Sequence, residues 1–169
     1  MLPDVNAITL RAVIREDEPF LLAVYASTRQ EELDRTQWDQ AQRAAFVAMQ
    51  FDAQCLHYKL NFPQAEHQVI LFEGERVGRL YIARLDAAIR ILDITILPER
   101  RNTGIGTSIL AGILNESRDA GKRVHIYVES FNPSLRLFER LGFIKADASD
   151  YNFLMEWTPK QSAESSPQC

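Results

Sequence analysis

The chain has 169 residues, a length typical of one domain, and 46% of them are hydrophobic, enough for a sizeable core. Its formal net charge of −4 argues against a nucleic-acid partner, and no apolar run is as long as a membrane span. The cysteines, Cys55 and Cys169, have no metal or disulfide spacing, and the N-terminus lacks a signal-peptide pattern. The composition therefore predicts a cytoplasmic domain that binds no metal, membrane or nucleic acid.

The first half of the chain contains both helical and strand patterns. Alternating apolar and polar residues predict strands, and apolar residues at helical spacing predict two helices, the second of which ends at Pro63. The predicted elements are a strand over 6–14, helices over 16–32 and 38–62, and a hairpin formed by 68–72 and 77–85 around Glu73-Gly74-Glu75.

The second half begins with the most apolar strand pattern of the chain. A β-branched run over 89–97 stops at Pro98, and an amphipathic helix follows from Gly106 to a capping glycine, Gly121. The remaining predicted elements are a strand over 124–128, a short helix beginning near Pro133, and two strands over 143–146 and 152–157.

The stretch from Leu97 to Leu110 joins a strand to a helix through two arginines and the pair Gly104 and Gly106. A helix N-terminus leaves several backbone N–H groups unpaired, adds partial positive charge and binds phosphate groups readily. Glycines let the backbone approach such a ligand closely. The stretch lacks the Gly-Lys-Ser/Thr of a P-loop and the third glycine of a dinucleotide fingerprint, so the sequence predicts neither of these sites.

The run from Arg101 to Gly106 resembles the acetyl-CoA pyrophosphate loop of the GNAT N-acetyltransferase superfamily. Residues 132–143, from Asn132 to Gly142-Phe143, resemble the second signature of that superfamily, and a helix and a strand lie between the two motifs. The resemblance covers residues 6–157. Without it, the loop would be interpreted as an ordinary strand–helix connection.

The resemblance implies an α/β (α+β) fold, with a mixed central sheet of six to seven strands and about four helices. The expected element order is β-α-α-β-β-β-α-β-α-β-β, in one domain over residues 1–158. The polar residues 159–169 are expected to be a disordered tail.

The implied activity is the transfer of an acetyl group from acetyl-CoA to a primary amine, by direct attack in a ternary complex. The acceptor, a small molecule or a peptide, is not identified by the sequence, and the resemblance leaves a homodimer open. Two other classes remain open: a catalytically silent acyl-CoA-binding or sensing module, and a protein-interaction domain in which the loop is structural.

The resemblance assigns the cofactor site to the loop, the strand before it and the second motif. In the superfamily a β-bulge frees a backbone N–H that polarises the thioester carbonyl. The resemblance places this bulge and its free N–H at Ile96 and Leu97. Asn132 would bind the pantetheine arm, and it is also a good helix cap. The expected cofactor-binding residues are Ile96, Leu97, Arg101, Asn102, Thr103, Gly104, Ile105, Gly106, Thr107, Asn132 and Phe138.

Two carboxylates are candidates for the base that deprotonates the amine. Asp93 lies in the middle of an apolar strand, on the face opposite to that of the neighbouring isoleucines. The alternative is an ion pair with Arg79 or Arg84 on the neighbouring hairpin strand. Glu129, at the end of the fifth strand, is the second candidate, and its alternative is a solvated strand end.

The sequence departs from the superfamily at Phe138, where a tyrosine usually protonates the leaving thiolate. Phenylalanine cannot donate a proton, so three alternatives remain. The thiolate can leave unaided, because thiols are fairly acidic. Tyr127 or Tyr151 can serve as the donor, of which Tyr151 is our catalytic candidate. The third alternative is the silent module.

The resemblance implies that the two N-terminal helices and the hairpin form the walls of the acceptor pocket. Helical spacing places polar and aromatic residues on one side of the long helix over 38–62. The expected substrate-binding residues are Phe51, Gln54, Tyr58 and Tyr81. The alternative is that the aromatic residues belong to the core.

Overall fold

The computed structural model describes residues 3–160, and the tail expected over 159–169 lies almost entirely outside them. One seven-stranded sheet has the order β1-β2-β3-β4-β5-β7-β6, and all neighbouring strands are antiparallel except β4 and β5, which are parallel. The strands are β1 (Ile8–Ala12), β2 (Glu66–Phe72), β3 (Glu75–Arg84), β4 (Ala88–Ile96), β5 (Arg123–Glu129), β6 (Ile144–Ala148) and β7 (Asn152–Trp157).

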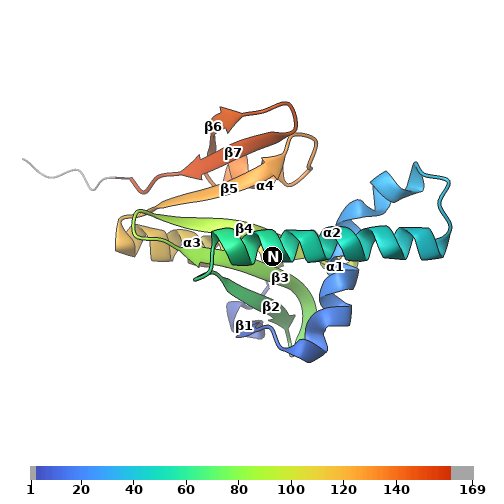
Figure 1. The fold of residues 1–169 in the computed structure, drawn as a ribbon. Helices are drawn as coiled ribbons and strands as arrows, with labels where there is room; N and C mark the ends of the chain where they lie inside the picture. The colour runs from blue at the N-terminus through green and yellow to red at the C-terminus, as the bar shows by residue number, and fades with distance from the viewer. Residues whose placement is uncertain (1–2, 161–169) are drawn as a thin grey trace, which may run out of the picture.

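Helices cover both faces of this sheet (Figure 1). The helices α1 (Glu18–Asp34) and α2 (Gln40–Asn61) lie on one face, and α3 (Ile105–Ala120) and α4 (Leu135–Arg140) lie on the other. The larger apolar core is on the second face, and the smaller core lies between α1 and α2. No helix within residues 3–160 is long and apolar enough to span a bilayer.

Local sequence signals set the ends of the main helices. Asp39 and Gln42 form a reciprocal capping box at the start of α2, with N···O distances of 2.8 and 3.0 Å. Gly121 ends α3 in a left-handed conformation, φ 65°, as the sequence predicted. Apolar residues at helical spacing place one apolar side of α3 in the core. The buried residues on this side are Ile105, Ile109, Leu110, Ile113 and Leu114.

The fold class and the element order expected from the resemblance are confirmed. Some bounds were wrong. The first strand is shorter than 6–14, and the sixth extends to Ala148, beyond the predicted end at 146. The short helix begins at Leu135 with Ser134 as its N-cap, so Asn132 does not cap it. Asn132 instead accepts a hydrogen bond from the backbone N–H of Ser134 (2.9 Å) in a turn before the helix.

The parallel strands β4 and β5 diverge and form a fork. Their pairing runs from Ala88 opposite Arg123 to Ile91 opposite Ile126 and then stops. Beyond this point β4 continues to Ile96 and β5 to Glu129 without pairing to each other. The backbone groups on the inner edges of the fork are therefore available to a ligand.

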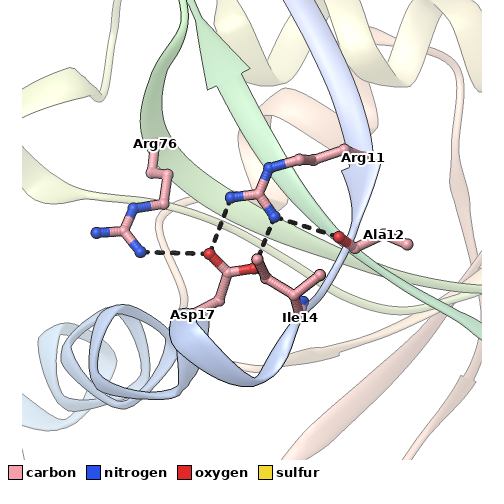
Figure 2. A network of polar contacts seen from close by, with 5 residues as sticks. All are labelled: Arg11, Ala12, Ile14, Asp17 and Arg76. Atoms are coloured by element: carbon pink, nitrogen blue, oxygen red, sulfur yellow. Dashed lines mark hydrogen bonds and ion pairs between the residues drawn. The ribbon is translucent and has the colours of Figure 1, made fainter.

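The junction of β1 and α1 is held by one buried carboxylate, Asp17 (Figure 2). Arg11 donates two hydrogen bonds to Asp17, at 2.7 and 2.9 Å, and Arg76 of β3 donates a third at 3.2 Å. The backbone N–H of Ile14 completes the set at 3.0 Å. These contacts, led by the hydrogen bonds from Arg11, hold the pKa of the Asp17 carboxyl well below its usual range.

Asp17→Asn should lower the free energy of unfolding at pH 7 by about 2 kcal/mol, because hydrogen bonds to a charged group are lost. A lowered folded pKa stabilises the fold above the unfolded value of about 3.9, and this stability is lost as the pH falls through the folded value. Urea unfolding at pH 7 and pH 3 measures both effects, and the difference between wild type and variant should shrink at pH 3. Asp34→Asn, at an exposed pair with Arg43, is the control, and an equal cost there would contradict the account.

Candidate functional site

The N-terminus of α3 presents unpaired backbone N–H groups beside the fork. Asn102 and Gly104 both adopt left-handed conformations, with φ of 59° and 86°, and Gly104 is the N-cap. The first helical hydrogen bond runs from the N–H of Ser108 to the carbonyl of Gly104, at 3.0 Å. The N–H groups of residues 105–107 therefore have no partner within the helix, and the helix dipole adds partial positive charge.

Gly106 leaves open space in front of this helix N-terminus. A Cβ added there would meet only Cγ1 of Ile96, at 3.9 Å, which is an ordinary contact. Its φ also lies outside the left-handed region. Neither packing nor backbone conformation therefore requires a glycine at this position. A ligand that approaches the backbone closely would require it, because glycine has no side chain.

The two arginines of the loop have different partners. Arg101 donates from Nε to the carbonyl of Ile96 (3.0 Å), which keeps its guanidinium at the fork. Arg100 instead pairs with Glu75 (2.8 Å). The Thr103 hydroxyl donates to the carbonyl of Arg100 (2.6 Å) and thereby closes the loop. Arg101 is therefore the arginine that adds charge to the site.

Of the two backbone N–H groups expected to bind the thioester, those of Ile96 and Leu97, only that of Ile96 points to the fork. The N–H of Leu97 donates to the carbonyl of Val77 at 2.8 Å, so the expectation that it is free was wrong. Because successive N–H groups along a strand point to opposite edges, those of Ile94 and Ile96 point to the fork. Ile96 thus remains the candidate for binding a thioester carbonyl.

The bulge of β4 lies earlier than the sequence mapping placed it. The register with β3 shifts between Tyr81 opposite Asp93 and Ile82 opposite Ile91, which leaves Leu92 as the extra residue. The mapping to Ile96 and Leu97 was wrong because a bulge is defined by pairing with another strand. Leu92 is also the residue at which the fork opens.

Asp93 forms an ion pair with Arg79, so the alternative left open by the sequence is confirmed. The Arg79 side chain is fully buried, and its Nε donates to Asp93 at 2.6 Å. The other carboxylate oxygen accepts from the Thr95 hydroxyl at 2.8 Å. Arg84 pairs instead with Glu66 and Glu116. Asp93 is therefore a fixed anion with both oxygens engaged.

The four predicted substrate-binding residues gather around this pair, three of them on α2 and Tyr81 on β3. Gln54 accepts a hydrogen bond from Arg79, and the Arg79 guanidinium lies 5.5 Å from the centre of the Phe51 ring. Tyr58 donates to the carbonyl of Leu92 (2.9 Å), and its ring packs edge-on against Tyr81 at 5.0 Å. The structure brings these residues together, and their main contacts are with residues of β3 and β4.

Two of them, Phe51 and Tyr81, also line a pocket of about 260 Å³ between α2 and the β1–α1 junction. His67 lies in the same pocket and stacks on Tyr81 at 4.4 Å. Burial, followed by the charge of Arg79, lowers the pKa of His67 to about 4, so the imidazole is neutral at pH 7. The pocket lies over β2 and β3, whereas the fork lies between β4 and β5.

The remaining candidates lie on the C-terminal half of the domain. Glu129, at the end of β5, pairs with Arg29 of α1 (3.2 Å) and is 37% exposed. Tyr151 is 73% exposed, and its carbonyl accepts from the N–H of Ser130, beside Glu129. The Asn132 carbonyl oxygen is used in its turn, and no partner for its NH2 group is found among residues 3–160. Phe138 is 3% exposed and packs against Phe143 in the core.

The sequence analysis missed Gly78 and Leu92. A Cβ on Gly78 would collide with the carbonyl oxygen of Thr95, so this glycine lets β3 approach the end of β4 closely. A glycine inside an apolar strand pattern is a signal for such an approach. Nothing in the local sequence distinguishes Leu92 from its neighbours.

Known proteins share this fold. The PaiA N-acetyltransferase from Thermoplasma acidophilum, in complex with coenzyme A, has a TM-score of 0.66 at 16% identity and covers 89% of this chain and 98% of its own. An acetyltransferase from Thermus thermophilus has a TM-score of 0.64 at 19% identity, with 90% and 97% covered. The yncA protein of Salmonella typhimurium, solved with its cofactor acetyl-CoA, has a TM-score of 0.56 at 18% identity, with 95% and 99% covered.

No curated sequence matches the chain. The model of the acetyltransferase (GNAT) family matches residues 23–143, which include most of α1, all of α2 and α3, the fork and both motifs. This match spans more than half of the chain, and the resemblance inferred from the two motifs is confirmed. With the sheet order and the helix N-terminus at the fork, it shows that the chain belongs to the acetyltransferase (GNAT) family.

Proposed function

We propose that this protein transfers an acetyl group from acetyl-CoA to a primary amine of its acceptor, within a ternary complex. The observation that carries the proposal is the open N-terminus of α3, where Gly106 leaves room for a ligand beside the β4–β5 fork. Membership of the family supports it, as do the related structures that contain coenzyme A or acetyl-CoA.

The residues of the site fit acetyl-CoA. The N–H groups of residues 105–107 would bind the pyrophosphate, assisted by Arg101 and the Thr107 hydroxyl. The NH2 group of Asn132 would donate to the pantetheine arm. The N–H of Ile96 would donate to the thioester carbonyl and stabilise the oxyanion that forms on it.

In the transfer step, the amine nitrogen forms a bond to the thioester carbon and the carbon–sulfur bond then breaks. The amine loses a proton, and we assign the role of the general base that takes up this proton to Glu129. Both oxygens of Asp93 are engaged by Arg79 and Thr95, whereas only one oxygen of Glu129 is paired, with Arg29, and its side chain is 37% exposed at the fork. Coenzyme A leaves as a thiolate, since thiols are fairly acidic, and we assign its later protonation to the exposed Tyr151.

A second candidate is an acyl-CoA-binding module without transferase activity. It is favoured by Phe138, which is buried and offers no proton at the position where the superfamily has tyrosine. Screening primary amines for release of free coenzyme A separates the two. Release with any amine supports the transferase, and tight acetyl-CoA binding with no release from any amine supports the module.

Glu129→Gln tests the assigned base. With an amine that the screen shows to be a substrate, the kcat of the variant at pH 7 should be about 100-fold below that of wild type, because a general base typically contributes a factor of this size. The Kd for acetyl-CoA should stay within twofold. Glu32→Gln is the matched control, because Glu32 is the other carboxylate beside Arg29, at 3.5 Å. Equal kcat values for Glu129→Gln and wild type would remove Glu129 from the mechanism.

A further inference from the structure

The backbone of β4 accepts a hydrogen bond from a side chain at its bulge. Leu92 has no partner in the register with β3, and the pairing with β5 ends one residue earlier, at Ile91. The hydroxyl of Tyr58 donates to the Leu92 carbonyl oxygen at 2.9 Å. Helix α2 therefore satisfies the backbone where the fork opens.

Tyr58 is itself held in place. Its ring packs edge-on against Tyr81 at 5.0 Å, and Tyr81 stacks on His67 at 4.4 Å. Burial, followed by the negative charge of Asp93, raises the pKa of the Tyr58 hydroxyl. The hydroxyl therefore remains a hydrogen-bond donor throughout the physiological pH range.

The residue after the bulge is fixed from the same side. Arg79 and the Thr95 hydroxyl hold the two oxygens of Asp93, and Arg79 also donates to Gln54 of α2. A bulge inserts one residue, and each inserted residue reverses which edge of the strand the following N–H groups face. The geometry at Leu92 thus decides that the N–H of Ile96 faces the fork.

We infer that Tyr58 is a positioning residue for acetyl transfer: by holding the Leu92 carbonyl, it fixes the bulge and aims the N–H of Ile96 at the thioester oxygen. The inference rests on the proposed function and assigns Tyr58 a role other than contact with the acceptor. The Tyr58 hydroxyl donates to the backbone carbonyl of Leu92, so Tyr58 affects the reaction through the conformation of β4.

Tyr58→Phe tests this, because it removes the hydroxyl and keeps the ring. The infrared carbonyl stretch of bound acetyl-CoA, labelled with ¹³C at the carbonyl, reports the hydrogen bond from Ile96 directly. In wild type the stretch should lie below that of free acetyl-CoA, and in Tyr58→Phe it should return toward the free value. The kcat should fall about tenfold or more, while the Kd for coenzyme A stays within twofold.

Tyr25→Phe is the matched control, since it also removes the hydroxyl of a buried tyrosine that donates a hydrogen bond, here from α1 to Gln50 of α2 at 3.4 Å. The bound carbonyl stretch should not change. If Tyr58→Phe does not fold, Thr95→Val loosens Asp93 more mildly and should shift the stretch in the same direction. A wild-type stretch in every folded variant would overturn the inference, whereas a wild type that fails to bind acetyl-CoA would overturn the proposed function itself.

Discussion

Gly106→Glu should raise the Kd for acetyl-CoA at least 100-fold while leaving the fold intact. The added Cβ meets only Ile96, at 3.9 Å, so the helix accepts the substitution. The glutamate then places bulk and negative charge at the helix N-terminus where the pyrophosphate is proposed to bind. Calorimetric titration measures the affinity, and thermal unfolding checks the fold.

Gly112→Glu provides a closely matched control. It makes the same change in the same helix, at a position where an added Cβ meets nothing within 4 Å. Its Kd for acetyl-CoA should equal that of wild type. Similar losses in the two variants would show that net charge or helix stability is responsible. Wild-type binding by Gly106→Glu would refute the placement of the pyrophosphate.

Asp93→Asn should lower the free energy of unfolding at pH 7 by about 3 kcal/mol, because it leaves the fully buried Arg79 guanidinium without its counter-charge. Urea unfolding measures this cost. The double variant Arg79→Met/Asp93→Leu should recover most of the stability, since buried ion pairs can be replaced by apolar side chains of similar volume.

Glu66→Gln is the control for the Asp93 prediction, because it removes a carboxylate from an exposed pair with Arg84, which lies on the same strand as Arg79. It should cost less than about 1 kcal/mol. An Asp93→Asn variant as stable as wild type, with an altered pH–rate profile, would contradict the account and restore Asp93 as the base.

Local patterns in the sequence predicted most of the helices and strands, whereas the fold that they form was implied by the resemblance to the superfamily. The apolar spacing of α3 and the glycine at its end are properties of neighbouring residues, and so are the strand patterns around the turn at Gly74. The loop from Arg101 to Gly106 was also recognisable, because a helix N-terminus needs no distant residue to present its N–H groups.

The details of the site could not be predicted because they depend on pairing between strands. Whether the N–H of Leu97 is free depends on Val77, which lies on another strand. The position of the bulge at Leu92 is likewise a property of the register with β3. The sequence left two alternatives for Asp93, and only the placement of Arg79 beneath α2 decided between them.

Titration of the wild-type protein with acetyl-CoA, desulfo-coenzyme A and ADP tests the central claim most directly. The account predicts micromolar binding of acetyl-CoA and desulfo-coenzyme A, and weaker but measurable binding of ADP, because all three carry the pyrophosphate that the N-terminus of α3 would bind. An absence of binding by all three ligands at millimolar concentration would contradict the account.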